Sequence, residues 1–279
     1  FTYNALGSKV TVLEFLPRVV ATMDEDLSKE LDKVLRKSGV DIKTGVKVTR
    51  VVTEAGKSTV AFQGEDGVEH SVSADVVLVA TGRTPFTEGL GLENVGIEVG
   101  SAKGRRAIPV DDRMRTKVDG IYAVGDVVGS GLAHTATAEG LVAAETICGH
   151  EAKMSYKAIP ACIYTEPELA AVGLTEAQAR EQGYDVEVGR FDFRSLGKAL
   201  AINDNVGFVK VVAEKQYGEI LGVHIIGPHA TDLIHEGVVS IQLENTVEEL
   251  MRTVHAHPTL GEAIGQAAED VKGMAIDKG

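Results

Sequence analysis

Two histidines and a glutamate near the end of the chain have the residue types and spacing of a proton-transfer site. The segment from residue 255 to residue 263 reads HAHPTLGEA. Proline fixes its own φ and disfavours the helical conformation at His257, so we expect a turn that brings Glu262 within hydrogen-bond reach of His257. A carboxylate bound to one ring nitrogen fixes the tautomer and raises the basicity of the other nitrogen. This arrangement suits a general acid or base.

Two other interpretations of the same segment remain open. A histidine paired with a glutamate is also a common structural feature, and the spacing alone does not separate that role from catalysis. His255 and His257 could lie on one face of a strand and bind a metal, but no third ligand is nearby and no cysteine supports such a site. We therefore expect no metal site, and we take His257 and Glu262 as the candidate catalytic pair.

The bulk composition limits the classes of function. The 279 residues suffice for about two domains, and 44% hydrophobic with 25% charged residues is ordinary for a soluble protein. A net charge of −13 without a long basic run argues against nucleic acid or an anionic membrane surface as a partner. No apolar run reaches membrane-spanning length. Cys148 and Cys162 are too far apart for a CxxC pair, so we expect two reduced, buried thiols.

The elements that must position a cofactor begin with residues 9–15, KVTVLEF, which have the composition of a buried strand. Glu14 lies at the end of this strand, where an acidic residue of a dinucleotide-binding fold accepts hydrogen bonds from the adenosine ribose. Any strand can end in a glutamate, so this position alone does not identify NAD. The glycine-rich turn that should precede it by about 20 residues is not in the sequence. The opening FTYNALG is typical of a helix tail, and we expect the sequence to start inside a nucleotide-binding unit.

Apolar periodicity predicts the next elements. Asp24 should cap a helix that ends at Gly39. Short strands at 46–53, 59–63 and about 69–73 indicate a hairpin or small meander. A fully apolar strand is expected at 75–80, followed directly by Gly82, which would let the backbone approach a ligand or a neighbouring chain closely. A plain turn from strand to loop explains this glycine equally well.

A second candidate ligand site follows a glycine- and proline-rich loop region. Residues 120–124, GIYAV, predict a short strand that delivers Gly125 and Asp126 at its carboxyl end, where open α/β sheets bind ligands. The glycine permits close approach, and the aspartate can accept hydrogen bonds from a polyol. Asp126 could instead cap the next helix, which we expect to reach Cys148. The residues that follow also match such a ligand site, which favours a ligand-binding role for Asp126 over a capping role.

The last part of the chain predicts a separate α+β unit. Strands are expected at 158–164, 185–193, 206–213 and 219–226, the last three alternating as antiparallel strands. Capping boxes at 175–178 and 246–249 should open two helices, and a further helix is expected at 229–243.

These motifs together closely resemble dihydrolipoamide dehydrogenase, a family of flavin disulfide reductases. The resemblance runs from Ser8 to the end of the chain and rests on ATGRTP at 80–85, Gly125-Asp126 and the HAHPTL segment followed by GEA. Serine is usual in the family at the position of Gly261, a departure that leaves the His257–Glu262 pair intact. Relatives of glutathione reductase usually bind NADPH through basic residues where this chain has Glu14. Mercuric reductases carry a terminal cysteine pair that this sequence lacks, and soluble transhydrogenases generally lack the histidine.

The resemblance implies FAD and NAD as cofactors. By it, Glu14, Val48 and Gly82 line the NAD site. Asp126 contacts the ribityl chain of FAD, and the segment under the flavin comprises Gly131, Leu132, Ala133 and His134. A helix N-terminus would face the flavin there.

The resemblance also implies a mechanism and partners. Dihydrolipoamide attacks a Cys–Cys disulfide, His257 takes up the thiol proton, Glu262 orients the imidazole, and electrons pass through FAD to NAD. The implied partners are a second copy of the chain and the lipoyl-bearing acyltransferase of 2-oxo acid dehydrogenase complexes. The implied location is the cytoplasm of a bacterium or the mitochondrial matrix of a eukaryote.

The implied fold is α/β and α+β in three parts. Residues 1–82 would be the C-terminal part of a Rossmann-like NAD domain, residues 83–153 the remainder of the FAD domain, and residues 154–279 the dimerisation domain. Neither the redox cysteine pair nor a glycine-rich fingerprint occurs in the sequence. We therefore expect a C-terminal portion of the enzyme that is inactive by itself. A non-enzymatic dimerisation or scaffold module is the alternative.

Overall fold

The computed structural model describes residues 1–102 and 105–278, which divide into two compact units. One unit combines residues 1–77 with residues from 157 onward, and the other comprises residues 78–156. The expected mixed α/β and α+β class is confirmed. The three domain boundaries drawn from the sequence stay a prediction. No helix in the described ranges has both the length and the apolar character needed to cross a membrane.

The N-terminal segment forms a β–α–β unit. Helix α1 (Thr2–Ala5) precedes β1 (Thr11–Leu13), which pairs in parallel with β2 (Asp41–Lys43). Between the two strands, α2 (Glu25–Lys37) begins as expected at Asp24, whose carboxylate accepts from the Asp26 N–H. Parallel strands need a long crossover connection, which is usually a helix, and α2 is that connection between β1 and β2.

The expected meander is also present. Strands β3 (Lys47–Glu54), β4 (Lys57–Gln63) and β5 (Glu69–Ala74) form an antiparallel three-stranded sheet in sequence order. The strand expected at 75–80 is wrong, because this segment has no strand assignment and exposes Val76, Leu78 and Val79. A strand exists only through hydrogen bonds to a neighbour, and none of the described strands pairs with this segment.

The unit of residues 78–156 holds only short elements apart from one helix. These elements are η1 (Leu92–Val95), the antiparallel pair β6 (Gly100–Ala102) and β7 (Arg105–Ala107), η2 (Gly125–Val128) and α3 (Ala133–Ile147). The strand expected at 120–124 is absent from the described elements, and a single bridge joins Tyr122 to Arg115 instead. The long helix to Cys148 is confirmed, since Cys148 is the C-cap of α3.

A five-stranded antiparallel sheet organises the C-terminal part. Its spatial order is β10-β11-β12-β9-β8. The strands are β8 (Ala161–Ile163), β9 (Glu168–Gly173), β10 (Val186–Asp192), β11 (Phe208–Glu214) and β12 (Ile220–Gly227). The helices are α4 (Glu176–Glu181), α5 (Gly197–Ala201), α6 (Ala230–Gln242), α7 (Val247–Arg252) and α8 (Glu262–Val271), with the short η3 (Phe193–Ser195). Both capping boxes are confirmed, whereas the sequence analysis did not identify β9 and α8.

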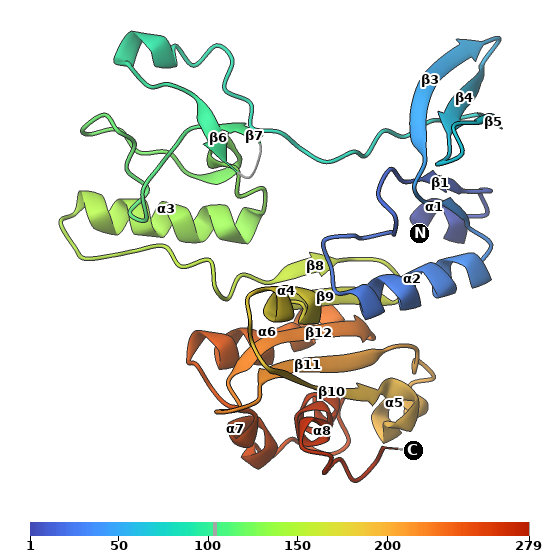
Figure 1. Cartoon of the computed structure of the whole chain (residues 1–279), viewed down its shortest axis with the longest axis vertical. Helices are drawn as coiled ribbons and strands as arrows, with labels where there is room; N and C mark the ends of the chain where they lie inside the picture. The colour runs from blue at the N-terminus through green and yellow to red at the C-terminus, as the bar shows by residue number, and fades with distance from the viewer. Residues whose placement is uncertain (103–104, 279) are drawn as a thin grey trace. The chain divides into compact units, whose positions relative to one another are not determined.

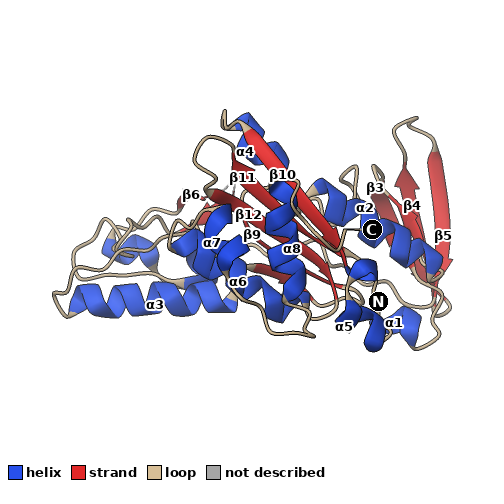
Figure 2. Cartoon of the chain, turned by 90° about the horizontal axis from the view of Figure 1, so that it is seen from below, coloured by secondary structure: helices blue, strands red, loops and turns tan. Residues whose placement is uncertain are grey.

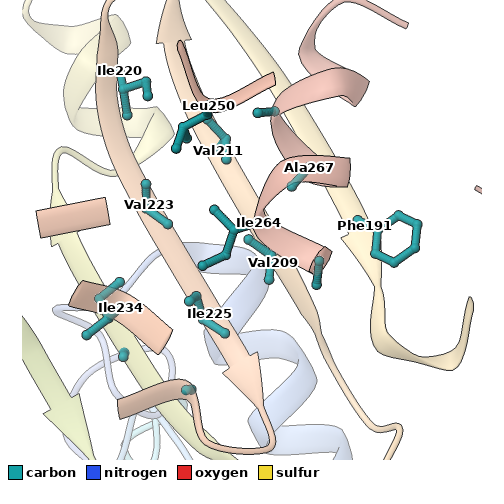
Figure 3. Close-up of a cluster of buried hydrophobic side chains, with 14 of the residues drawn as sticks. Phe191, Val209, Val211, Ile220, Val223, Ile225, Ile234, Leu250, Ile264 and Ala267 are labelled. Atoms are coloured by element: carbon teal, nitrogen blue, oxygen red, sulfur yellow. The ribbon is translucent and has the colours of Figure 1, made fainter. Parts of the chain in front are cut away.

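Helices α6, α7 and α8 lie along the same face of this sheet (Figures 1 and 2). The apolar core between helices and sheet includes Val209, Val211, Val223 and Ile225, all fully buried (Figure 3). Ile264 places α8 on this core. The helix that begins at Glu262 is therefore anchored to a rigid sheet.

The opposite face of the sheet carries a buried lysine. Lys210 on β11 has a side chain only 3% exposed, and its ammonium lies 2.9 Å from Asp24 Oδ1, 2.7 Å from Asp26 Oδ2 and 2.9 Å from Glu176 Oε2. Burial lowers the pKa of this ammonium, but hydrogen bonds to Asp26, Glu176 and Asp24 raise it above the usual lysine value. Lys210 therefore remains charged and joins α2 and α4 to the sheet.

Replacing this lysine tests its contribution to stability. Lys210→Met leaves the buried Asp24 carboxylate without a cation, so the free energy of unfolding should fall by about 3–5 kcal/mol in urea titration. Adding Asp24→Asn, which removes that charge and still caps α2, should restore part of the loss. Lys29→Met, at an exposed pair with Glu25, is the control and should change little. Equal losses in the Lys210 and Lys29 variants would contradict this account.

Candidate functional site

The loop between α7 and α8 brings His257 and Glu262 together as the sequence predicts. His257 Nδ1 lies 2.8 Å from Glu262 Oε1, and the other carboxylate oxygen accepts from the Thr259 N–H at 2.8 Å. The Thr259 hydroxyl donates to the Ala256 carbonyl at 2.6 Å, which closes the turn around Pro258. The His257 side chain is 79% exposed, whereas Glu262 is 23% exposed. The Glu262 carboxylate is therefore fixed by hydrogen bonds, and the His257 imidazole bound to it is exposed to solvent.

Glu262 is kept in its ionised form by its surroundings. Burial raises the pKa of this carboxyl, but the Thr259 N–H and the His257 ring together lower it below its ordinary value. Its place in the first turn of α8 also favours negative charge. A carboxylate that stays ionised over the range in which histidine titrates can stabilise an imidazolium on His257.

The second histidine of the segment has a different environment. His255 Nε2 lies 2.8 Å from Glu236 Oε1 on α6, and its side chain is 15% exposed. The two imidazoles therefore contact different carboxylates, and no cluster of three possible metal ligands occurs among the described residues. Glu236 precedes His255 by 19 positions, so no local spacing in the sequence could have identified this partner.

The turn at Gly125 and Asp126 is held from the side of α3. Gly125 has φ +81°, a conformation that favours glycine, and its N–H donates to Glu139 Oε2 at 2.7 Å. Glu139 is fully buried and also accepts from the Tyr156 hydroxyl at 2.8 Å. Burial and the contact with Glu139 raise the pKa of that hydroxyl well above its usual value. Glu139 lies 14 positions after Gly125 in a helix without a distinct apolar stripe, so no pattern in the sequence points to it.

The predicted flavin segment lies at the start of α3. Gly131, with φ +74°, precedes Leu132, the N-cap of the helix, and Ala133 and His134 follow in its exposed first turn. Asp126 is 42% exposed and accepts from Arg83 Nε at 3.1 Å. Two buried hydroxyl oxygens nearby in the sequence, Ser130 Oγ and Thr135 Oγ1, have no hydrogen-bond partner within the described ranges. Helix N–H groups and unpaired hydroxyls fit a polar, anionic ligand such as a flavin nucleotide.

The three predicted NAD residues fall in both units. Glu14 follows β1, and its Oε1 accepts from the Leu16 N–H at 2.8 Å. Val48 lies on β3 beside a β-bulge and is 44% exposed. Gly82 has φ +97° and belongs to the unit of residues 78–156. Their common role stays a prediction.

The two cysteines are free, as expected, but only one is partly buried. Cys162 is half-buried, and burial followed by the nearby Glu168 and Asp232 carboxylates raises the pKa of its thiol. Cys148 is exposed at the end of α3, so the expectation of burial is wrong there. Cys148 is the C-cap of α3, and the apolar pattern of the sequence does not show that the helix ends at the surface.

Two family models match the chain. Residues 1–140 match the pyridine nucleotide-disulphide oxidoreductase model, and residues 159–268 match the dimerisation domain of that group. The mitochondrial dihydrolipoyl dehydrogenase of Pisum sativum is 42% identical over 268 residues, covering 95% of this chain and 53% of the relative. The dihydrolipoyl dehydrogenase of Bacillus subtilis is 42% identical over 273 residues, covering 97% of this chain and 57% of the relative. The chain thus spans about half the length of the curated relatives that it matches.

Solved structures show the same similarity. LpdA from Mycobacterium tuberculosis has a TM-score of 0.87 and 29% identity, covering 96% of this chain and 57% of that one. The HOCl-induced flavoprotein disulfide reductase RclA from Escherichia coli has a TM-score of 0.85 and 28% identity, covering 96% and 60%.

Removing the buried carboxylate behind Gly125 should loosen the turn that carries Asp126. Glu139→Ala leaves the Gly125 N–H without its acceptor and removes one contact of the Tyr156 hydroxyl, a loss of about 1–3 kcal/mol in a buried site. Amide hydrogen exchange at Gly125 should therefore accelerate by about 5- to 150-fold. Glu145→Ala, at an exposed position of the same helix that pairs with His150, is the matched control. The two variants exchanging at the same rate would show that Glu139 does not hold the turn.

Proposed function

Because the chain belongs to the pyridine nucleotide-disulphide oxidoreductase family, we propose that it is part of a dihydrolipoyl dehydrogenase. This enzyme would oxidise protein-bound dihydrolipoamide through a redox disulfide and FAD and pass the electrons to NAD. The observation that carries the proposal is the His257–Glu262 pair, with Nδ1 held 2.8 Å from a carboxylate on a buried helix. The 42% identity to two dihydrolipoyl dehydrogenases supports the choice of substrate.

The proton chemistry follows from the geometry of the pair. Glu262 binds Nδ1 and so leaves Nε2, on a ring that is 79% exposed, as the nitrogen that can receive a proton. Attack of a thiol on a disulfide requires the thiolate, and His257 Nε2 would accept the proton that the thiol releases. The ionised Glu262 would then stabilise the imidazolium and fix its orientation. A proton returned from Nε2 would restore the neutral ring.

Two groups of residues would hold the two cofactors. Asp126 and the start of α3, from Gly131 to His134, would bind FAD, which supplies the electron transfer between dithiol and nicotinamide. Glu139 would keep the Gly125-Asp126 turn in place through the bond to the Gly125 N–H. Glu14 and Val48, which belong to one unit, would line the NAD site, with the Glu14 carboxylate accepting from ribose hydroxyls.

The proposed partners follow from the family and from charge. The match of residues 159–268 to a dimerisation domain supports a homodimer. We further propose that a basic segment of the lipoyl-bearing acyltransferase binds the dimer, consistent with the net charge of −13. The proposed location is the bacterial cytoplasm or the mitochondrial matrix, since the relatives include a Bacillus enzyme and a mitochondrial one.

Substitution of His257 tests the proton-transfer role. In enzyme that contains flavin and redox disulfide, His257→Gln should slow dihydrolipoamide oxidation by about 10²- to 10⁴-fold, the usual effect of losing a positioned acid or base. NADH oxidation by a one-electron acceptor needs no thiol proton and should be largely retained. Stopped-flow measurement of both reactions separates the two steps. If both reactions slow equally, His257 has a structural role.

Substitution of Glu14 tests the choice of nicotinamide cofactor. Its carboxylate can accept from ribose hydroxyls but would repel a 2′-phosphate, so the enzyme should prefer NAD to NADP. Glu14→Ala should reduce this preference by about 1–3 kcal/mol, measured as the ratio of kcat/KM for the two cofactors. Glu54→Ala, at an exposed strand end, serves as the control for lost charge. A wild-type enzyme that uses NADP as well as NAD would refute the assignment of Glu14.

A further inference from the structure

His255 is the more enclosed of the two histidines in the α7–α8 loop. Its ring contacts α6 through Glu236, and its side chain is 15% exposed compared with 79% for His257. The Glu236 side chain is itself 29% exposed, so this ion pair is partly shielded from water. Because His255 precedes His257 by only two residues, fixing the His255 ring also restricts the backbone that carries His257.

The other side of the His255 ring packs on the first turns of α8. A Cβ atom built at Gly265 would lie 2.9 Å from both Cε1 and Nδ1 of the ring, which is too close for contact without a shift. At Gly261 a Cβ would lie 3.7 Å from Cδ2, an ordinary contact. Gly265 therefore provides the space in which the ring sits, about one helical turn beyond Gly261 and Glu262. The ring is wedged between α6 and α8.

We propose that the Glu236–His255 pair, seated at Gly265, is a positioning device that holds the loop so that His257 Nδ1 stays on Glu262. The proposal rests on the proposed function, because it concerns the residue that would accept the thiol proton. His255 links the helix that carries Glu236 to the helix that begins at Glu262, and the backbone between residues 255 and 262 closes the connection. His255 and Glu236 touch no reacting atom in this scheme.

The charges around His255 support this arrangement. The groups that face its ring are Glu236 on α6, Glu262 on α8 and the Thr253 backbone of its own loop. The hydrogen bond to Glu236 raises the pKa of His255 against the opposing effect of burial, and the charges of Glu236 and Glu262 raise it further. A cationic His255 also helps to keep Glu262 ionised. The stabilisation from this pair is complete below the ordinary histidine pKa of about 6.5 and is lost as the pH rises through the raised folded value.

The test measures the pKa of His257 directly in the full chain, without any cofactor. Diethyl pyrocarbonate modifies only the unprotonated imidazole, so the modification rate of the His257 peptide against pH, followed by mass spectrometry, has its midpoint at that pKa. Glu236→Gln keeps the shape of the side chain but removes its charge, and Gly265→Ala fills the seat of the ring. Each should lower the midpoint by about 0.5–1 pH unit, because the contact between His257 and Glu262 loosens.

Matched controls separate this effect from general damage. Glu181→Gln removes an exposed charge on α4, and Gly140→Ala adds a methyl group in α3 where no atom lies within 4 Å. Both should leave the midpoint unchanged. Circular dichroism checks folding, and if Gly265→Ala does not fold, the isosteric Glu236→Gln decides the outcome alone.

Glu262→Gln separates failure of this inference from failure of the proposed function. A midpoint that falls in Glu262→Gln but not in Glu236→Gln overturns the positioning role and leaves the His257–Glu262 pair intact. A midpoint that falls in neither variant means that Glu262 does not tune His257, which contradicts the proposed function itself. In flavin-containing enzyme, Glu236→Gln should also lower kcat for dithiol oxidation by about tenfold while KM for NAD stays unchanged.

Discussion

The structure depends on the burial of both faces of β11 and β12. Every residue of β12 is buried, and alternate residues of β11 point to opposite faces. Val209 and Val211 meet the core under α6, α7 and α8, whereas Phe208 and Val212 meet the apolar clusters that include residues of α2 and α4. The period of two then places Lys210 on the α2 face, where a cation must be neutralised. The three carboxylates around its ammonium follow from this constraint.

The same sheet supports the candidate catalytic pair from its other face. Ala263, Ile264 and Ala267 anchor α8 in the core, so the first turn of that helix has a defined position. Glu262 lies in this turn and accepts from Thr259 and from His257, and the histidine ring extends into solvent. A proton acceptor is useful only when it is both exposed to its substrate and fixed in direction. The core supplies the fixed direction, and the loop supplies the exposure.

The candidate flavin segment is positioned by a buried hydrogen bond and not by a broad sheet. No broad sheet lies behind it in the unit of residues 78–156, where the described strands are only β6 and β7. One buried carboxylate, Glu139, instead joins α3 to the Gly125 turn and to Tyr156. Such a bond is strong because it is shielded from water, and its loss is costly for the same reason. The position of Asp126 thus depends on this buried hydrogen bond and on a small apolar cluster that includes Ala123 and Val127, while that of His257 depends on the large core under α8.

Local chemistry could be predicted from the sequence, and non-local contacts could not. The limits of α2, both capping boxes, the three-stranded meander and the His257–Glu262 pair involve residues close in sequence, the farthest being Lys47 and Gln63, and Ser58 and Ala74, of the meander. Their geometry follows from backbone preferences, apolar period and turn residues. The bond from Lys210 to Asp24 spans 186 positions, and neither residue's type or local sequence predicts the other as its partner. Segment 75–80 has the composition of a strand, yet composition cannot supply the neighbour that makes a strand. Glu236 beside His255 and Glu139 beside Gly125 are likewise decided only when helices pack, because packing brings together side chains that sequence distance keeps apart.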